Sequence, residues 1–168
     1  MIQTTFFLSP WETLPPFTRD ETLFRALSAC LGPEANCKII HTPVTWGGAW
    51  QTPRALLNEV MGQTDDPAHT LVWASRLEHA PLVHAIKMRG IRVIIDEQTL
   101  IHDHLGASWL VRVAAAWNRR IIISRGFPSD AVTALSAASA LRLGRYANGV
   151  PVLSVPECMT PEVLDPSP

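Results

Sequence analysis

Charged residues are scarce in this sequence, and so are cysteines. Asp, Glu, Lys and Arg together make up 17% of the 168 residues, and the formal net charge is −1. A charge so close to zero argues against the broad basic surface of a non-specific nucleic-acid-binding protein. The three cysteines contain no CxxC pair. Their odd number and wide spacing exclude a disulfide framework and favour a reducing, cytoplasmic environment.

Long hydrophobic runs and glycine-rich phosphate motifs are also missing. No run reaches the roughly 18 apolar residues that a membrane span needs. The first residues contain Pro10, Pro15 and Pro16 and lack a basic start, which argues against a signal peptide. Neither GxGxxG nor GxxxxGK[ST] follows the first expected strand, so no backbone cradle for a dinucleotide or a triphosphate is predicted. We expect no membrane span and no cofactor.

Apolar residues are plentiful at 47%, and they alternate between short β-branched runs and segments with helical spacing. The strands read as nearly continuous apolar runs, which is typical of a parallel sheet covered on both faces. The expected strands are 4–9, 37–44, 69–75, 91–96, 119–124 and 150–155, and the expected helices are 18–32, 52–62, 78–89, 107–118 and 128–144.

This alternation predicts the fold class. We expect a three-layer α/β/α sandwich around a mostly parallel sheet of five or six strands, with a receiver-like or Rossmann-like arrangement. One domain should cover residues 1–155, and the proline-rich residues 156–168 should form a tail or linker. The first helix has the clearest boundaries, with Thr18 as N-cap, Glu21 as capping-box partner and Gly32 as stop.

Candidate binding residues follow two of the expected strands. Ligands of open α/β sheets bind at the carboxyl ends of the strands. Asp96 ends the strand 91–96, Glu97 comes directly after it, and Arg125 follows the strand 119–124. Arg125 could hold an anion beside the amide groups of the next helix, or it could pair with a surface carboxylate. We expect binding at most from these residues, and no catalytic residue is assigned.

The segment "RVIIDEQTLIHDH" (92–104) is the densest group of possible metal ligands. Its histidines, His102 and His104, lack the i, i+4 spacing of the common helical zinc motif, and no cysteine lies near. We therefore expect no metal, and we interpret the segment as a central strand followed by a solvated loop. Val93 and Ile95 should matter for stability, whereas the two histidines should not.

Partner contacts have two candidate locations. Trp46 and Trp50 flank two glycines in an expected loop, where they could anchor a partner or fold back over the core. The alanine-rich helix expected over 128–144 has small side chains on several sides, so Ala134, Ala138 and Leu141 are candidate interface residues. The alternative is that this helix is buried between the sheet and the tail.

The second half of the chain resembles a response-regulator receiver domain. The resemblance covers residues 69–146 and rests on the succession "HTLVWAS", "APLVHAIKMRG", "IRVIIDE", "WLVRVAAAWNRRIIIS" and "PSDAVTALSAA". It is closest to degenerate receivers such as those in cyclic di-GMP-responsive accessory proteins of bacterial cellulose secretion. Working receivers carry an acidic pair after the first strand and a phospho-accepting Asp after the third. Here the only acidic residue near the end of the first strand is Glu12, and the third strand is followed by Ser75 and Arg76 where the phospho-accepting Asp would lie.

This resemblance implies a non-catalytic regulatory module. It would contact a protein partner, or a second copy of itself, in a bacterial secretion or signalling complex. A second resemblance, of "LVWASRLEHAPLVHAIKMRGIRVIIDE" to NYN-type PIN nucleases, implies metal-binding carboxylates near Leu77 and His79, where only Glu78 remains. The alternative function is therefore an enzyme or nucleotide-binding domain, such as a diverged nuclease of that type, that uses the strand-end carboxylates.

Overall fold

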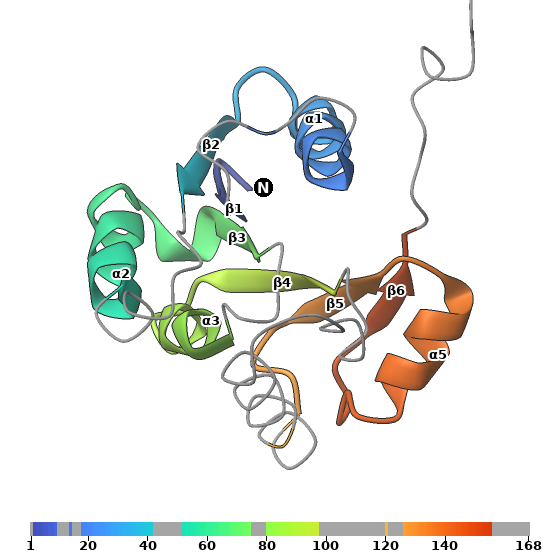
Figure 1. Cartoon of the computed structure of the whole chain (residues 1–168). Helices are drawn as coiled ribbons and strands as arrows, with labels where there is room; N and C mark the ends of the chain where they lie inside the picture. The colour runs from blue at the N-terminus through green and yellow to red at the C-terminus, as the bar shows by residue number, and fades with distance from the viewer. Residues whose placement is uncertain are drawn as a thin grey trace, which may run out of the picture.

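The described residues form a six-stranded parallel sheet with helices on both faces (Figure 1). The computed structural model describes residues 2–9, 14, 18–41, 52–74, 80–97, 120 and 126–155. The strands are β1 (Thr4–Ser9), β2 (Asn36–His41), β3 (Thr70–Ala74), β4 (Arg92–Glu97), β5 (Ala131–Ala134) and β6 (Val152–Ser154). The described helices are α1 (Arg19–Leu31), α2 (Thr52–Gly62), α3 (Ala80–Lys87) and α5 (Ala137–Gly144), with a short 3₁₀ helix at Pro67–His69.

The strand order confirms the expected fold class. It runs β2-β1-β3-β4-β5-β6, and every neighbouring pair is parallel. The first five positions follow the doubly wound order of flavodoxin-like and receiver-like folds, and β6 extends the sheet by one edge strand. The edge strand expected within 150–155 is therefore confirmed. None of the helices in the described ranges is both long enough and apolar enough to cross a membrane.

Two helices, α2 and α3, cover one face of the sheet. Alternate residues of each strand point to this face. Their side chains are mostly aliphatic or aromatic, and they are almost completely buried between the sheet and the helices. Burying each such side chain stabilises the fold by about 1.5–3 kcal/mol. The core of this face contains Phe6, Leu8, Leu56, Leu57, Val60, Val72, Val83, Ile86, Val93, Ile95 and Val132.

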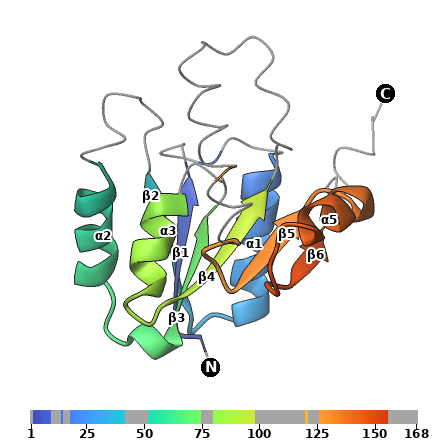
Figure 2. The same cartoon turned by 90° about the horizontal axis from the view of Figure 1, so that it is seen from below.

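Helix α1 lies on the opposite face, so the sheet is enclosed between helical layers (Figure 2). Phe24 of α1 meets Phe7 of β1 edge to face, with ring centroids 5.8 Å apart. Phe7 in turn stacks on Trp73 of β3 at 6.4 Å. Trp73 is buried and packs in the core on this face.

The ends of α1 are those expected from the sequence. The hydroxyl of Thr18 accepts a hydrogen bond from the backbone N–H of Glu21, which satisfies one of the free amide groups at the helix start. Gly32 ends the helix with φ +84°, a left-handed conformation that glycine adopts without steric cost. Its N–H donates to the carbonyl of Ser28. Local chemistry is sufficient to define this helix.

The expected helix over 128–144 is wrong in its first half. Residues Ala131–Ala134 form β5, and α5 begins only at Ala137, with Ser136 as its N-cap. Pairing with β4 outweighs the helix propensity of the alanines, because it completes the backbone hydrogen bonds and buries Val132. The helix expected over 107–118 lies outside the described residues. So does the strand expected over 119–124, except for Arg120, whose backbone is helical.

Asp130 explains why the helix does not begin where the sequence suggests. As an N-cap, its side chain would bond to amides two or three residues ahead. Instead, its carboxylate accepts the N–H of Val93 at 2.8 Å and lies 3.0 Å from the ammonium group of Lys87. The backbone N–H of Asp130 also donates to the carbonyl of Val93. The acidic side chain therefore joins the start of β5 to β4 and α3.

Ala134, a candidate interface residue, requires the same correction. It lies in β5, and none of its surface is exposed. It is part of the core and cannot contact a partner from the surface of a helix. A charge placed at this position would disrupt the core. Of the three candidate interface residues, Ala138 and Leu141 are the ones that lie on the exposed surface of α5.

Alanine at Gly126 is expected to destabilise the fold more than alanine at Gly90. The two glycines have nearly the same positive φ, +79° and +81°, so each substitution places an L-residue in the left-handed region at a cost of about 1–2 kcal/mol. A Cβ at Gly126 would also lie 2.9 Å from the Cβ of Asn148, whereas nothing lies within 4 Å at Gly90. Urea unfolding measures both variants, and equal losses would contradict the contact with Asn148.

Candidate functional site

The carboxyl edge of the sheet is where a fold of this order places a ligand, beside the point at which the strand order reverses. In this chain the reversal lies between β1 and β3. The two strands end in Ser9 and Ala74, and both residues are fully buried. The strand ends at the reversal therefore present a hydroxyl and a methyl group, and neither is a carboxylate.

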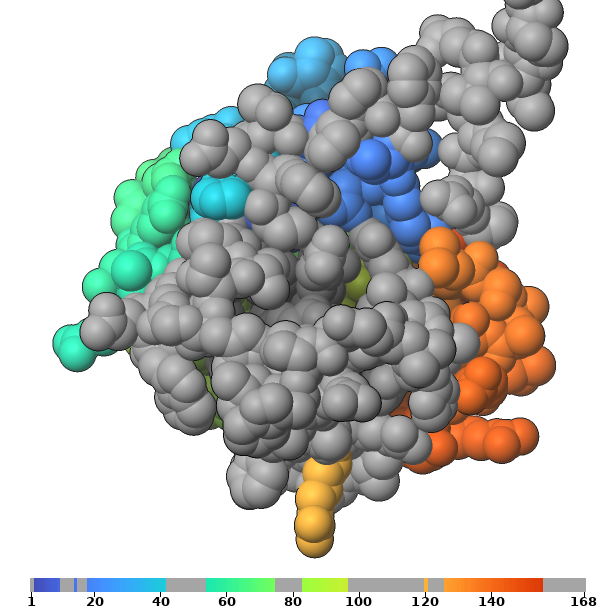
Figure 3. Space-filling view, in the orientation of Figure 1, coloured from blue at the N-terminus to red at the C-terminus, as the bar shows by residue number. Residues whose placement is uncertain are grey.

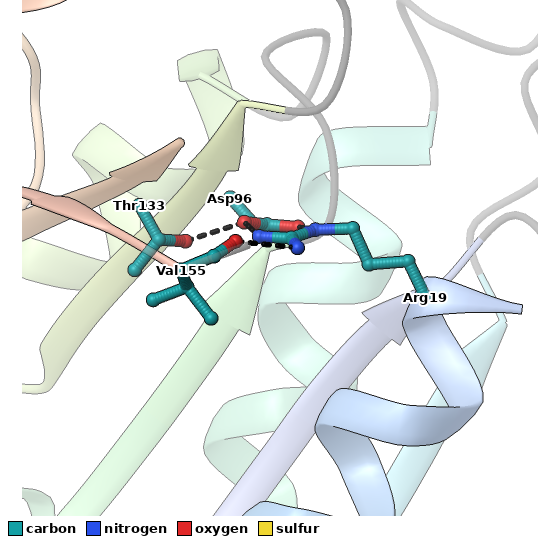
Figure 4. A network of polar contacts seen from close by, with 4 residues as sticks. All are labelled: Arg19, Asp96, Thr133 and Val155. Carbon is teal, nitrogen blue, oxygen red and sulfur yellow. Dashed lines mark hydrogen bonds and ion pairs between the residues drawn. The ribbon is translucent and has the colours of Figure 1, made fainter. Parts of the chain in front are cut away.

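A buried polar cluster lies one strand further along this edge (Figure 4). Arg19 at the start of α1 binds Asp96 of β4 in a bidentate arrangement, with Nε 2.9 Å from Oδ2 and Nη2 2.8 Å from Oδ1. Thr133 of β5 donates its hydroxyl to the same Oδ1 atom. The remaining guanidinium nitrogen, Nη1, donates to the carbonyl of Val155 at 2.7 Å.

Four elements bring these groups together. Asp96 and Thr133 are paired across β4 and β5, so their side chains project from the same face of the sheet. Helix α1 covers this face of the sheet. Arg19 is its first residue, directly after the N-cap Thr18, and its side chain reaches the strand ends. Val155 follows β6. The cluster therefore links α1 to three strands that lie far from it in sequence.

Burial determines what this cluster can do. The side chain of Asp96 is completely buried, and that of Arg19 is 6% exposed. An isolated charge at such a depth costs several kcal/mol, and the bidentate ion pair with its additional hydrogen bonds offsets that cost. Because three hydrogen bonds already occupy the two oxygens of Asp96, this carboxylate is engaged and is not free to act as a base or metal ligand.

The start of α1 is not arranged to hold a phosphate. A helix N-terminus attracts anions because its free amides and its dipole are positive. Here Asp20 and Glu21 lie in the first turn, and the Asp96 carboxylate lies against Arg19. These carboxylates already provide negative charge at the start of the helix, and they would repel a bound phosphate.

Of the residues that the sequence singled out for binding, Asp96 is the one found in the cluster. Glu97 is the last residue of β4. Arg125, Trp46 and Trp50 lie outside the described residues, as do His102 and His104 of the "HDH" segment. Within the described ranges, no group of three or more His, Cys, Asp or Glu residues is placed to hold a metal ion.

Sequence reasoning missed Arg19 and Thr133. A signal for Arg19 was present, because a positive side chain in the first turn of a helix is unfavourable next to the positive end of the helix dipole. Such a residue is best accommodated when a carboxylate from elsewhere in the fold is close. Thr133 had no comparable signal, since its role depends on the pairing of β5 with β4.

Comparison of this chain with protein-family models, with curated proteins and with solved structures gives no match.

Proposed function

We propose that this chain is a non-catalytic, receiver-like module that acts by binding another protein. The observation that carries this proposal is the state of Asp96, which is fully buried and bound by Arg19 and Thr133. A carboxylate in that state can neither accept a proton from a substrate nor coordinate Mg²⁺ without breaking the ion pair. Among the described residues, this cluster at the carboxyl edge therefore supports a structural role for Asp96.

The positions that carry receiver chemistry support the same proposal. A receiver transfers phosphate to an aspartate after the third strand and holds Mg²⁺ with acidic residues after the first. Here β1 ends in Ser9 and β3 ends in Ala74, and the sequence continues from β3 with Ser75 and Arg76. A module with this fold and without these carboxylates retains a surface for regulatory contacts. Its resemblance to degenerate receivers suggests a bacterial secretion or signalling complex.

Incubation with a small phosphodonor and Mg²⁺ is expected to leave the intact mass of the chain unchanged, because no carboxylate takes the place of the phospho-acceptor. Mass spectrometry measures this directly, with a catalytically competent receiver domain treated in parallel as the positive control. Mg²⁺ and nucleotides should also leave the melting temperature unchanged, since a ligand that binds only the folded state would raise it. A phosphate mapped to a strand-end aspartate would overturn the proposal.

Thermal stabilisation by Mg²⁺ or a nucleotide would favour the alternative, an enzyme or nucleotide-binding domain related to NYN-type PIN nucleases. In that alternative, Asp96 would have to release Arg19 to take part in the chemistry. Stabilisation should then be lost in an Asp96→Asn variant, provided that circular dichroism shows this variant to be folded without the charge that pairs with Arg19. This comparison separates the two functions with the same purified protein.

A further inference from the structure

Helix α5 has two distinct faces. Ala140, Leu143 and Ala147, which continues the same row after the helix, are turned toward the core. The opposite side is exposed and comprises Ala138, Leu141 and Arg142 of α5, together with Arg145 and Tyr146 directly after the helix. We call these five residues the α5 outer face. Figure 3 shows the part of the chain that includes α5 at the surface of the molecule.

The α5 outer face exposes two large hydrophobic side chains. Leu141 is 76% exposed and Tyr146 is 39% exposed. Ala138 is exposed one turn before Leu141, and its small side chain lets another backbone approach closely. Tyrosine and arginine are enriched at protein contact sites, and the α5 outer face contains both in addition to an exposed leucine.

The charge of this region has one sign. From Ala131 to Val155 the sequence contains two charged residues, Arg142 and Arg145, and no Asp, Glu, Lys or His. Both arginines are exposed and belong to the α5 outer face. Neither makes an ion pair within the described part of the chain. Within the described residues, the positive charge around Leu141 is thus not neutralised by a carboxylate.

This positive charge favours a different protein over a second copy of the chain as the partner of the α5 outer face. A symmetric pair of identical chains brings the same surface to both sides of the contact. It would gather four guanidinium groups at the α5 outer face without a carboxylate from the same segment, and like charges at a contact are unfavourable. A partner with acidic residues around an apolar side chain would complement both the arginines and Leu141.

We propose that the α5 outer face binds an acidic amphipathic segment of another protein. Leu141 would contact the apolar side of that segment, while Arg142 and Arg145 would bind its carboxylates. This inference rests on the proposed function, because it identifies the surface and the chemistry of the partner for a module that acts by protein contact. It differs from the sequence-based expectation of either a partner or a second copy, since it assigns this surface to an acidic partner.

The probe is a pair of synthetic amphipathic peptides with the same leucine pattern, one with glutamate and one with lysine at the polar positions. Each is titrated into the full ¹⁵N-labelled chain. The glutamate peptide should shift the amide signals of residues 137–146 and bind more weakly as salt is raised, because exposed charge pairs are screened. The lysine peptide should not bind. Equal binding of both peptides, or no shift of 137–146 at millimolar glutamate peptide, would overturn the inference.

Charge reversal supplies the matched comparison. Arg142→Glu with Arg145→Glu should weaken binding of the glutamate peptide by about tenfold or more, equivalent to 1.4 kcal/mol or more. Arg54→Glu with Arg89→Glu changes the net charge by the same amount on two exposed arginines of other segments and should leave binding unchanged. Ala138→Glu should weaken binding as well. Circular dichroism checks that the variants are folded, and equal affinity of the two double variants would contradict the proposed surface.

Sedimentation separates a failure of this inference from a failure of the proposed function. A dimer that dissociates when Arg142 and Arg145 are reversed would show that the α5 outer face binds a second copy. The inference would then be wrong, although the proposal of a contact module would stand. Phosphate on a strand-end aspartate would instead overturn the proposed function itself, whatever the peptides do. The expected result is a chain that stays monomeric over the concentrations used for titration.

Discussion

Replacing Asp96 with alanine should destabilise the protein by about 3–5 kcal/mol, because the substitution leaves the buried guanidinium of Arg19 without its counter-charge. Asp96 is fully buried and accepts bonds from Arg19 and Thr133. The loss should appear as a lower urea midpoint with an unchanged slope, since the surface exposed on unfolding stays nearly the same. Arg19→Met should also be strongly destabilising, because it leaves the carboxylate unpaired.

An ion pair whose arginine is exposed, on the same helix, is the control. Arg25 and Glu21 are one turn apart on α1, and the Nη2 atom of Arg25 lies 2.6 Å from the Oε1 atom of Glu21. The Arg25 side chain is 74% exposed. Pairs of this kind contribute about 0.3–0.5 kcal/mol, so Arg25→Ala should cost far less than Asp96→Ala. A cycle of Arg19→Met, Asp96→Leu and the double variant measures the coupling. The double variant should recover most of the loss, and additive losses would contradict a direct interaction.

The second large effect is expected at Ile95, in the core between β4 and the helices α2 and α3. Truncation to alanine should cost about 2–5 kcal/mol, since it removes buried methyl groups and leaves a cavity. Ile95 has no exposed surface. Its neighbour Ile94 projects to the other face and is only partly buried, so it provides a matched control with the same chemistry.

Ile94→Ala should therefore cost clearly less than Ile95→Ala when both variants are unfolded in urea. The comparison depends on the alternation of side chains along a strand, which places adjacent residues on opposite faces of the sheet. A larger loss at Ile94 would mean that the register of β4 in the sheet is shifted by one residue. In that case Asp96 would also face the opposite layer, and its pairing with Arg19 would fail.

Short-range chemistry explains which elements could be predicted. β1 and α2 have the boundaries expected from the sequence, and α1 matches within one residue at each end. Each is defined by neighbouring residues, such as Thr18 as the cap of α1 and Gly32 as its stop. The region around β5 could not be predicted this way, because "AVTA" lies in a segment rich in alanine whose local preference is helical.

By itself, the sequence determined the class of the protein: an alternation of apolar strands and amphipathic helices that can only be buried as layers around a parallel sheet. Hydrophobic period and helix capping act over a few residues, so they can be read directly from the chain. Tertiary structure alone decided that Ala131–Ala134 is a strand, that Ala134 is buried, and that Asp96 is held by Arg19. These outcomes depend on contacts between residues as far as 77 positions apart, where the burial of a charge and the pairing of backbones outweigh local preference.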